Sequence, residues 1–206
     1  MSDERALLHL VAANGADLAL EVDQLDAAIT VMHRDPSCFH GAGSPQTVAL
    51  ETAAAGADAL THAAESLGPL IDPARSMAIV GADRVFIEPP EPTPVRYQFL
   101  MHRRSDFTHD DYLARYESIH SEFGIRTPNL DGYVQLHVDL DASRELGAST
   151  GLMAEPCDSM SELHLRSVEH FLEGITAHPE VGQEAMEDEE RFVDRARSFG
   201  FAHRVV

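Results

Sequence analysis

The segment "YQFLMHRRSDFTHDDYLARYESIH", residues 97–120, contains the change of pattern that decides the fold. Residues 97–102 alternate in character closely enough to predict a strand. A helix is predicted to begin at Thr108, because Thr108 and Asp111 have the spacing of a capping box and acids suit the positive end of the helix dipole. The segment therefore indicates a strand followed by a helix.

The predicted helix has one buried side and a histidine near its end. Tyr112 and Tyr116 recur at helical spacing and form part of an apolar stripe. His102 stands near the end of the strand, and His120 stands near the end of the helix. The pKa of histidine is close to neutrality, so both are candidates for acid/base chemistry. The alternative for His120, which flanks the apolar stripe, is a buried structural histidine.

The rest of the C-terminal half completes a known supersecondary unit. A polar loop with Gly147 and Gly151 separates its two middle strands, and helices are predicted near Ser167 and Pro179. The order β-α-β-β-α-β predicts an α+β fold of the ferredoxin-like class, with helices on one face of an antiparallel sheet. The later strands are predicted in "DGYVQLHVDL" (131–140), "SMSELHLRS" (159–167) and "FGFAHRVV" (199–206).

A proline-rich linker at 89–95 divides the chain into an N-terminal part, 1–88, and a C-terminal domain, 96–206. In the N-terminal part we expect strands in "RALLHLVAA" (5–13) and "RSMAIVGADRVFIEP" (75–89), and helices at 18–32 and 48–67. This part is either a degenerate copy of the ferredoxin-like unit, which would make a tandem pseudo-dimer, or an unrelated helical cap. Exposed barrel faces need a cover, so we expect a homodimer unless the N-terminal part supplies it.

Composition excludes several classes of function. Thirty-five acids against 15 bases give a formal net charge of −20, which disfavours nucleic acids and anionic membrane surfaces as partners. The chain has no lysine, which excludes Schiff-base chemistry at a lysine. No apolar run is long enough for a membrane span, and no signal peptide is evident. Cys38 and Cys157 have no metal-type spacing, so a cytoplasmic protein is expected.

Four segments carry a family resemblance over residues 97–206. In this order the segments resemble the EthD family, within the dimeric α/β-barrel superfamily. The resemblance implies a small-molecule protein in which two sheets pack face to face, as a dimer or a tandem fusion. Related barrels include polyketide cyclases, dehydratases, lactone isomerases, quinol-type monooxygenases and haem enzymes. The segments are "HRRSDFTHDDYLARYESIH" (102–120), "LDGYVQLHV" (130–138), "DSMSELHLRSVEHFL" (158–172) and "DEERFVD" (188–194).

The resemblance also implies site residues. The helix-end histidine of the family matches His120, the histidine of its second strand matches His137, and the glutamate of its third strand matches Glu162. His102 stands where the family commonly has a lysine, and His164 where it commonly has an aromatic residue. Both departures enrich the sheet in histidine.

Strand alternation and the strand order place a polar group on one sheet face, in the register that we expect. His102, His137, Glu162 and His164 would project from that face, with His120 reaching it from the helix. The leading hypothesis is a pocket in which histidine acts as general base in lyase- or isomerase-type chemistry, without a cofactor. The substrate would be a hydrophobic, aromatic or polyketide-like carbonyl compound. Substrate contacts are expected from Tyr116, Tyr133, Gln135 and Arg103, although a surface ion pair is the alternative for Arg103.

Two other hypotheses remain open. His137, Glu162 and His164 have the ligand types of a two-histidine, one-carboxylate site for a transition metal such as iron, which would indicate an oxygenase or lyase. The protein could also bind a hydrophobic metabolite without turning it over.

Overall fold

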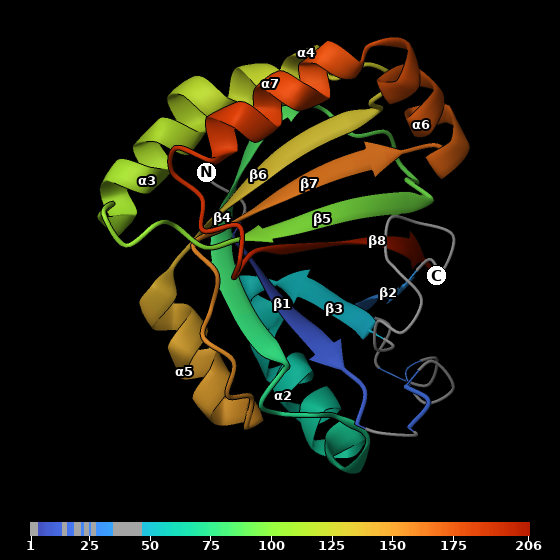
Figure 1. Ribbon diagram of the computed structural model, residues 1–206. Helices are drawn as coiled ribbons and strands as arrows, with labels where there is room; N and C mark the ends of the chain where they lie inside the picture. The colour runs from blue at the N-terminus through green and yellow to red at the C-terminus, as the bar shows by residue number, and fades with distance from the viewer. Residues whose placement is uncertain (1–3, 14–15, 19–21, 23–24, 26–27, 35–46) are drawn as a thin grey trace. The chain divides into compact units, whose positions relative to one another are not determined.

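The computed structural model describes residues 4–13, 16–18, 22, 25, 28–34 and 47–206 (Figure 1). In the N-terminal half the elements are β1 (Glu4–Val11), β2 (Thr30–Arg34), β3 (Thr47–Ala53), α2 (Ala57–Leu67) and β4 (Met77–Ile87). In the C-terminal half they are β5 (Val95–Met101), α3 (His109–Arg115), a π-helical turn (Tyr116–His120), α4 (Ser121–Arg126), β6 (Gly132–Val138), α5 (Leu140–Thr150), β7 (Ser159–Leu165), α6 (Val168–Ala177), α7 (Pro179–Glu189) and β8 (Phe199–Val205). None of the described helices is both long and apolar enough to cross a lipid bilayer.

The hydrogen-bonded strand order is β1-β3-β2-β8-β5-β7-β6-β4, and this order closes on itself as a barrel. The C-terminal strands follow the order β8-β5-β7-β6, which is the 4-1-3-2 arrangement of a ferredoxin-like sheet. The N-terminal strands repeat the arrangement as β4-β1-β3-β2. The α+β barrel class is therefore confirmed, and the tandem arrangement is the alternative that the strand order matches. The expected homodimer stays a prediction.

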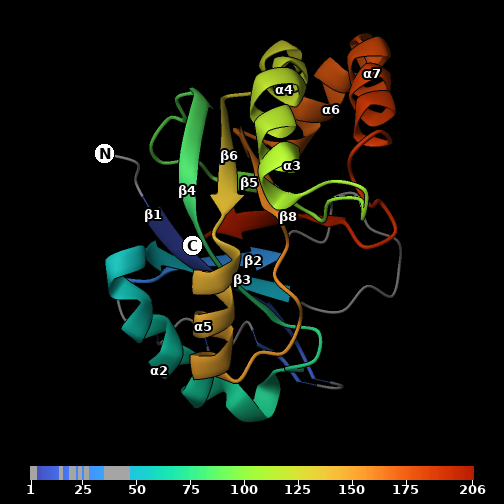
Figure 2. The ribbon, with the colours of Figure 1, turned by 90° about the vertical axis from the view of Figure 1, so that its left-hand side faces the viewer.

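The chain divides into two compact units, and their boundaries differ from a single division at the proline-rich linker. One comprises 1–83, 138–156 and 203–206, and the other comprises 84–137 and 157–202. The first is called unit 1 and the second unit 2. In unit 1, helices α2 and α5 lie side by side (Figure 2). In unit 2, helices α3, α4, α6 and α7 lie over strands β5, β6 and β7 (Figure 1).

Two parts of the predicted secondary structure are wrong in the N-terminal half. The end of the helix predicted at 18–32 is strand β2, and the start of the helix predicted at 48–67 is strand β3. A short apolar run suits a buried strand as well as a helix, because a strand buried on both faces loses its alternation. The remainder of the segment from 18 to 29 lies largely outside the described residues, as does Cys38.

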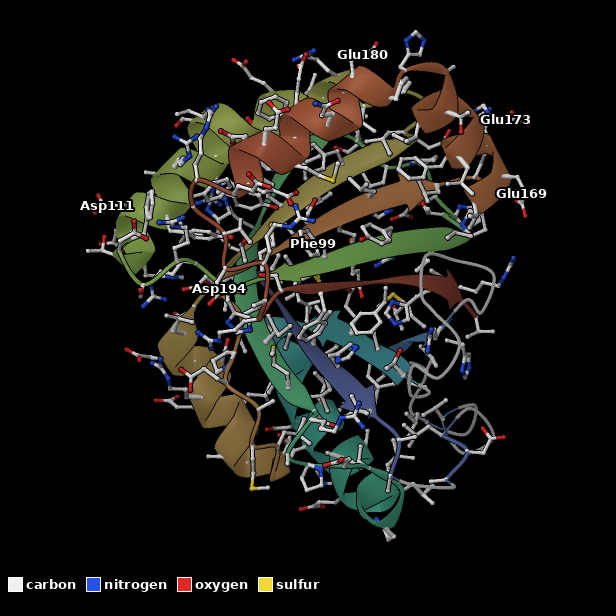
Figure 3. The ribbon with its side chains drawn as sticks, viewed as in Figure 1. Phe99, Asp111, Glu169, Glu173, Glu180 and Asp194 are labelled. Atoms are coloured by element: carbon white, nitrogen blue, oxygen red, sulfur yellow. The ribbon has the colours of Figure 1, made fainter. Side chains whose placement is uncertain are left out.

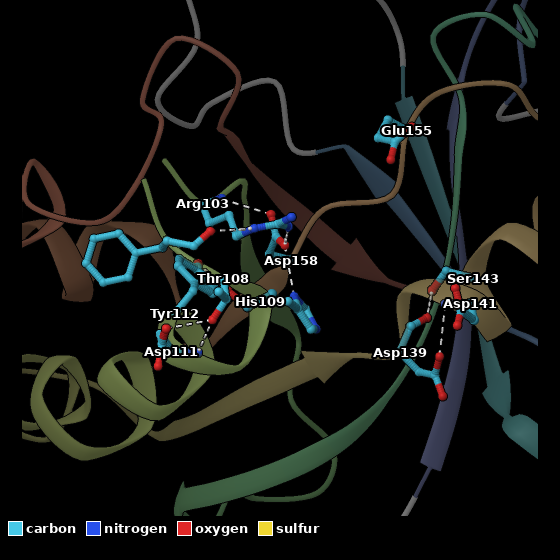
Figure 4. Close-up of polar contacts among 12 residues, drawn as sticks. Arg103, Thr108, His109, Asp111, Tyr112, Asp139, Asp141, Ser143, Glu155 and Asp158 are labelled. Carbon is cyan, nitrogen blue, oxygen red and sulfur yellow. Dashed lines mark hydrogen bonds and ion pairs between the residues drawn. The ribbon is translucent and has the colours of Figure 1, made fainter. Parts of the chain in front are cut away.

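The predicted polar loop at Gly147 and Gly151 is also wrong, because this stretch is helix α5. The carboxylate of Asp139 caps the helix by accepting hydrogen bonds from the backbone of Asp141 and Ala142, both at 3.0 Å (Figure 4). Gly151 ends it in the left-handed conformation at φ 74°, which is the usual role of a glycine at a helix terminus. Glycine is therefore not a loop signal at either position, because Gly147 lies inside the helix and Gly151 terminates it.

Several acidic residues lie on outer helix faces. Glu169, Glu173 and Glu180 point away from α6 and α7 in Figure 3, and Asp111 points away from α3. The helix start predicted at Thr108 is confirmed, because the Thr108 hydroxyl caps α3 by accepting a hydrogen bond from the Asp111 backbone at 3.1 Å (Figure 4).

Candidate active site

Pairing between β6 and β7 decides which side chains share a face of the unit 2 sheet. Tyr133 lies opposite Leu163, and His137 lies opposite Ser159, whereas Glu162 lies opposite Val134. Directly paired residues project to the same face, and neighbours along a strand project to opposite faces. His137, Tyr133 and Gln135 are therefore on one face, and Glu162 and His164 are on the other. The expectation that His137 shares a face with Glu162 and His164 is wrong.

The face with His137 is the one that the helices cover. The Gln135 side-chain amide donates a hydrogen bond to the Tyr116 carbonyl at 3.1 Å. The hydroxyls of Tyr112 and Ser159 are hydrogen-bonded at 2.7 Å. Helix α3 and the π-helical turn thus pack on this face of β6 and β7.

Between this face and the helices lies a group of titratable side chains, which we call the helix-side cluster: Tyr116, His120, His137, Asp188 and Glu189. The His120 ring contacts two carboxylates, with Nδ1 3.1 Å from Asp188 Oδ2 and Nε2 3.8 Å from Glu189 Oε1. The rings of His120 and His137 both lie against Tyr116, at centroid separations of 5.8 and 5.9 Å.

Three arginines hold the carboxylates of the helix-side cluster. Arg115 and Arg191 form ion pairs with Asp188, and Arg195 forms one with Glu189. Asp188 is buried, so these arginines and His120 together satisfy a carboxylate that would otherwise be costly to bury.

Burial shifts the pKa values of this cluster in opposite directions. It raises the pKa of Glu189 from 4.5 to about 7 and lowers the pKa of His137 from 6.5 to about 4. Burial also lowers the pKa of His120, although the hydrogen bond with Asp188 opposes the change. At neutral pH the two imidazoles are therefore neutral, and Glu189 is divided between its protonated and ionised forms.

Hydrogen bonds define the tautomer of each imidazole. His120 Nδ1 donates to the Asp188 carboxylate, so its Nε2 carries the lone pair. Gln135 Nε2 must donate both to the Tyr116 carbonyl and to the Tyr133 hydroxyl, at 3.1 and 2.7 Å. Its oxygen therefore faces His137 Nε2 at 3.3 Å and accepts the hydrogen from that nitrogen. The free lone pair of His137 is consequently on Nδ1.

An aromatic layer and an irregular helix surround these groups. Phe192 lies 5.4 Å from the His120 ring and 5.3 Å from the Tyr112 ring, measured between centroids. The π-helical turn Tyr116–His120 places both of its terminal side chains in the buried layer. Such turns occur often at functional sites, because the widened turn redirects side chains.

The Tyr116 hydroxyl is a buried polar group without a well-formed hydrogen bond. It lies near the Tyr133 hydroxyl and Ser161, yet within the described part of the chain it makes no hydrogen bond of good geometry. Burial raises the pKa of Tyr116 well above its ordinary value, so the group is a neutral donor. Buried hydroxyls normally have a partner, and this one is available to a bound molecule or to water.

Asp188 and Glu189 are not among the site residues predicted from the sequence, because acidic residues of a helix are usually solvent-exposed. A signal was present: the buried residues of α7 are Val181 and Asp188, which are two helical turns apart. Asp188 thus continues the buried stripe of the helix, which ends beside Phe192.

The opposite face of the same sheet carries a second group of polar side chains, the sheet-face cluster: Arg96, Gln98, Glu162 and His164. His164 Nε2 lies 3.1 Å from Glu162 Oε1, and Gln98 donates to Glu162 Oε2 at 2.6 Å. The proposed metal ligands do not converge, because His137 is on the other face. Among the described residues, no three histidine, cysteine or acidic side chains are placed to hold a metal ion.

The two other predicted residues, His102 and Arg103, directly follow strand β5. His102 is buried beyond the end of β5, where its backbone is hydrogen-bonded to Ser198 and Asp194. Arg103 forms an ion pair with the buried Asp158, which also accepts a hydrogen bond from His109 at 2.9 Å (Figure 4). Arg103 and His109 thus tie the start of α3 to the segment before β7.

Solved structures of other proteins have folds similar to that of this chain. A protein described as anthrone oxidase-like has 13% sequence identity and a TM-score of 0.57, with 100% of this chain and 94% of that chain covered. A protein of Lactobacillus acidophilus NCFM assigned as a monooxygenase has 10% identity and a TM-score of 0.53, with the same coverage. A protein assigned as a chlorite dismutase has 10% identity and a TM-score of 0.54, with 98% and 95% covered. At these identities the likeness shows the fold alone. No curated protein matches the chain.

The sequence resemblance is confirmed by a match to a family model. The description of that family is EthD domain, and the match covers residues 104–196, which include His120, His137, Asp188 and Glu189. Residues 104–196 of this chain are therefore similar to the EthD domain.

Proposed function

We propose that the protein is a small-molecule enzyme in which the helix-side cluster performs acid/base chemistry of the lyase or isomerase type. The substrate would be an aromatic or polyketide-like carbonyl compound, and the reaction would need no cofactor. We expect the enzyme to work in the cytoplasm. The roles of Glu162, His164 and His102 in the original hypothesis pass to Asp188 and Glu189, which lie beside His120.

The observation that carries the proposal is the placement of His120 between two carboxyl groups of different character. Asp188 accepts the Nδ1 hydrogen and leaves the Nε2 lone pair directed toward Glu189. The pKa of Glu189, about 7, is close to the value at which a carboxyl group can give or take a proton at neutral pH. Groups whose environments move their pKa values apart are typical of acid/base pairs in active sites.

The proposed proton transfers balance without an external reagent. His120 Nε2 removes a proton from the carbon next to the substrate carbonyl, and the imidazolium that forms is stabilised by Asp188. The Glu189 carboxyl gives its proton to the enolate oxygen or to a leaving hydroxyl. The resulting carboxylate is stabilised by Arg195, and it recovers a proton from His120. The Tyr116 hydroxyl and His137 Nδ1 are then a donor and an acceptor for the substrate's polar groups.

The aromatic layer supports the choice of substrate class. The rings of Tyr116 and Phe192 lie against the His120 ring, and the Tyr112 ring packs on both of them. Aromatic rings pack favourably on one another. A planar aromatic compound is the ligand that such surroundings complement.

The test is a screen of enolisable aromatic carbonyl compounds, followed by His120→Gln and Asp188→Asn variants of the active protein. Loss of the base is expected to reduce kcat by roughly 10²- to 10⁴-fold. His178→Gln is the matched control, because the His178 side chain is 60% exposed and is not a member of the helix-side cluster. Full activity of His120→Gln, with circular dichroism unchanged, would refute the assignment. Binding of the compounds without turnover would instead indicate a carrier.

The pH dependence of kcat/KM gives a second test of the same roles. Activity should fall as pH rises above about 7, where Glu189 loses its proton, and should fall again in acid, where His120 becomes protonated. The Glu189→Gln variant should lose the alkaline limb.

A further inference from the structure

We propose that the sheet-face cluster is a second binding site, which takes an uncharged small molecule through a hydroxyl group that donates to His164 Nδ1. The site is separate from the helix-side cluster, since the two project from opposite faces of the same strands. It does not depend on the proposed enzymatic function.

The four side chains form two cross-strand rows. Gln98 pairs directly with Glu162, and Arg96 pairs directly with His164, so all four project to one face of β5 and β7. Glu162 accepts from Gln98 at 2.6 Å, and its other oxygen lies 3.8 Å from Arg96 Nη1. Three of these side chains, Gln98, Glu162 and His164, are at most 4% exposed. Buried polar side chains cost free energy unless they are hydrogen-bonded to one another, so these groups depend on each other as a network.

Glu162 determines which nitrogen of His164 carries hydrogen. Both carboxylate oxygens already face donors, so Glu162 acts as an acceptor toward His164 Nε2 at 3.1 Å. In the neutral imidazole the single ring hydrogen is then on Nε2 and is donated to Glu162, so Nδ1 keeps its lone pair. His164 is 4% exposed, and in the described part of the chain its Nδ1 has no hydrogen-bond partner. The site therefore presents an oriented acceptor without a protein donor.

The surroundings indicate the class of ligand. The charge of Glu162 is already matched by Arg96, and the whole chain is strongly acidic, so a further anion is disfavoured. Gly132 lies opposite His164, and a Cβ atom on Gly132 would come within 2.6 Å of Pro89 Cα. Pro89 thus provides an apolar surface on the same face as His164. An alcohol or phenol combines the donor that Nδ1 lacks with an apolar body that suits proline.

The experiment is a titration of the ¹⁵N-histidine-labelled full chain with phenol, followed by imidazole nitrogen NMR. The His164 signals are assigned by their loss in His164→Gln. We expect the unprotonated Nδ1 signal of His164 to move in a saturable manner toward the position of a hydrogen-bonded nitrogen. We expect the same shift in His120→Gln, which separates this site from the helix-side cluster, where an aromatic probe could also bind.

Two variants separate a binding site from a structural contact. Glu162→Gln should weaken the apparent Kd for phenol at His164 at least tenfold, because the tautomer is no longer imposed. Ser161→Ala, a change at the neighbouring position on the other face, should leave that Kd unchanged. A His164 Nδ1 signal that does not move up to the solubility limit of phenol would overturn the proposal. So would an Nδ1 that already carries the hydrogen, or a shift that is lost in His120→Gln.

Discussion

The Glu189→Gln substitution tests the electrostatic state of the helix-side cluster without any knowledge of the substrate. Burial raises the pKa of Glu189 from 4.5 to about 7, so the folded protein opposes ionisation of this carboxyl. The side chain is only 12% exposed, so little of the effect is lost to solvent screening. At about 1.4 kcal/mol per pH unit, the change in pKa corresponds to about 3 kcal/mol once the pH exceeds both values.

The sign of the effect follows from proton binding. Between pH 4.5 and about 7 the folded state holds the Glu189 proton more firmly than the unfolded state does. This contribution to stability is fully present below the unfolded pKa and is lost as pH rises through the folded pKa. Glutamine cannot ionise, so the variant does not lose this stability as the pH rises. Relative to wild type, Glu189→Gln should therefore gain about 3 kcal/mol of unfolding free energy between about pH 5 and about pH 8.

Urea unfolding at several pH values, followed by far-UV circular dichroism, measures this difference in a chain that has no tryptophan. Comparison with wild type cancels the opposite pH dependence of His137, whose pKa is lowered to about 4. Glu190→Gln is the matched control, because it removes a neighbouring exposed carboxyl. A stability difference between Glu189→Gln and wild type that stays constant with pH would refute the reasoning.

Two further predictions concern packing and accessibility. Gly124→Ala should destabilise the protein by about 1–3 kcal/mol, because the added Cβ would overlap the Tyr133 ring. Gly182→Ala, where nothing lies within 4 Å of an added Cβ, should instead stabilise by up to about 1 kcal/mol, and thermal unfolding distinguishes the two. Burial raises the pKa of the Cys157 thiol, so in a Cys38→Ser background it should react with a thiol reagent only after unfolding. Rapid labelling of Cys157 under native conditions would contradict its buried position.

The elements that carry local signals were predictable from sequence. The capping box at Thr108 and the cap at Ser167 mark the starts of α3 and α6, because a hydroxyl at those positions accepts from the first turn. The order of elements in the C-terminal half then led to the correct strand arrangement. In the N-terminal half the prediction was wrong at β3. This strand is buried along most of its length, and a strand without a polar face does not show an alternation of polar and apolar residues.

The candidate site was only partly predictable, for a different reason. His120 and His137 were identified, but the side to which a strand residue projects depends on register, which local sequence does not define when both faces are buried. Gln135 and Tyr133 illustrate the point, because both are buried and polar and neither reveals its face. Asp188 is harder still, since its role depends on contact with His120, which is 68 residues away along the chain.

A comparison of the two units bears on whether the helix-side cluster is functional. In unit 1 the layer between sheet and helices is aliphatic, with Leu8 and Leu50 of the strands packed against Leu60 of α2 and Leu146 of α5. Such a layer is sufficient for folding, because apolar burial is the main stabilising contribution. The corresponding layer of unit 2 contains histidine, carboxylate and tyrosine hydroxyl groups, which cost free energy to bury unless each is hydrogen-bonded.

The fold itself therefore does not require polar groups between a sheet and its helices. Tyr116 makes this clearest, because among the described residues its buried hydroxyl makes no hydrogen bond of good geometry, and a phenylalanine would fill the same space without a polar group to satisfy. A group that lowers stability and has a ready apolar substitute is typical of a site that acts on another molecule. This contrast, within one chain, favours a functional role for the helix-side cluster over a purely structural one.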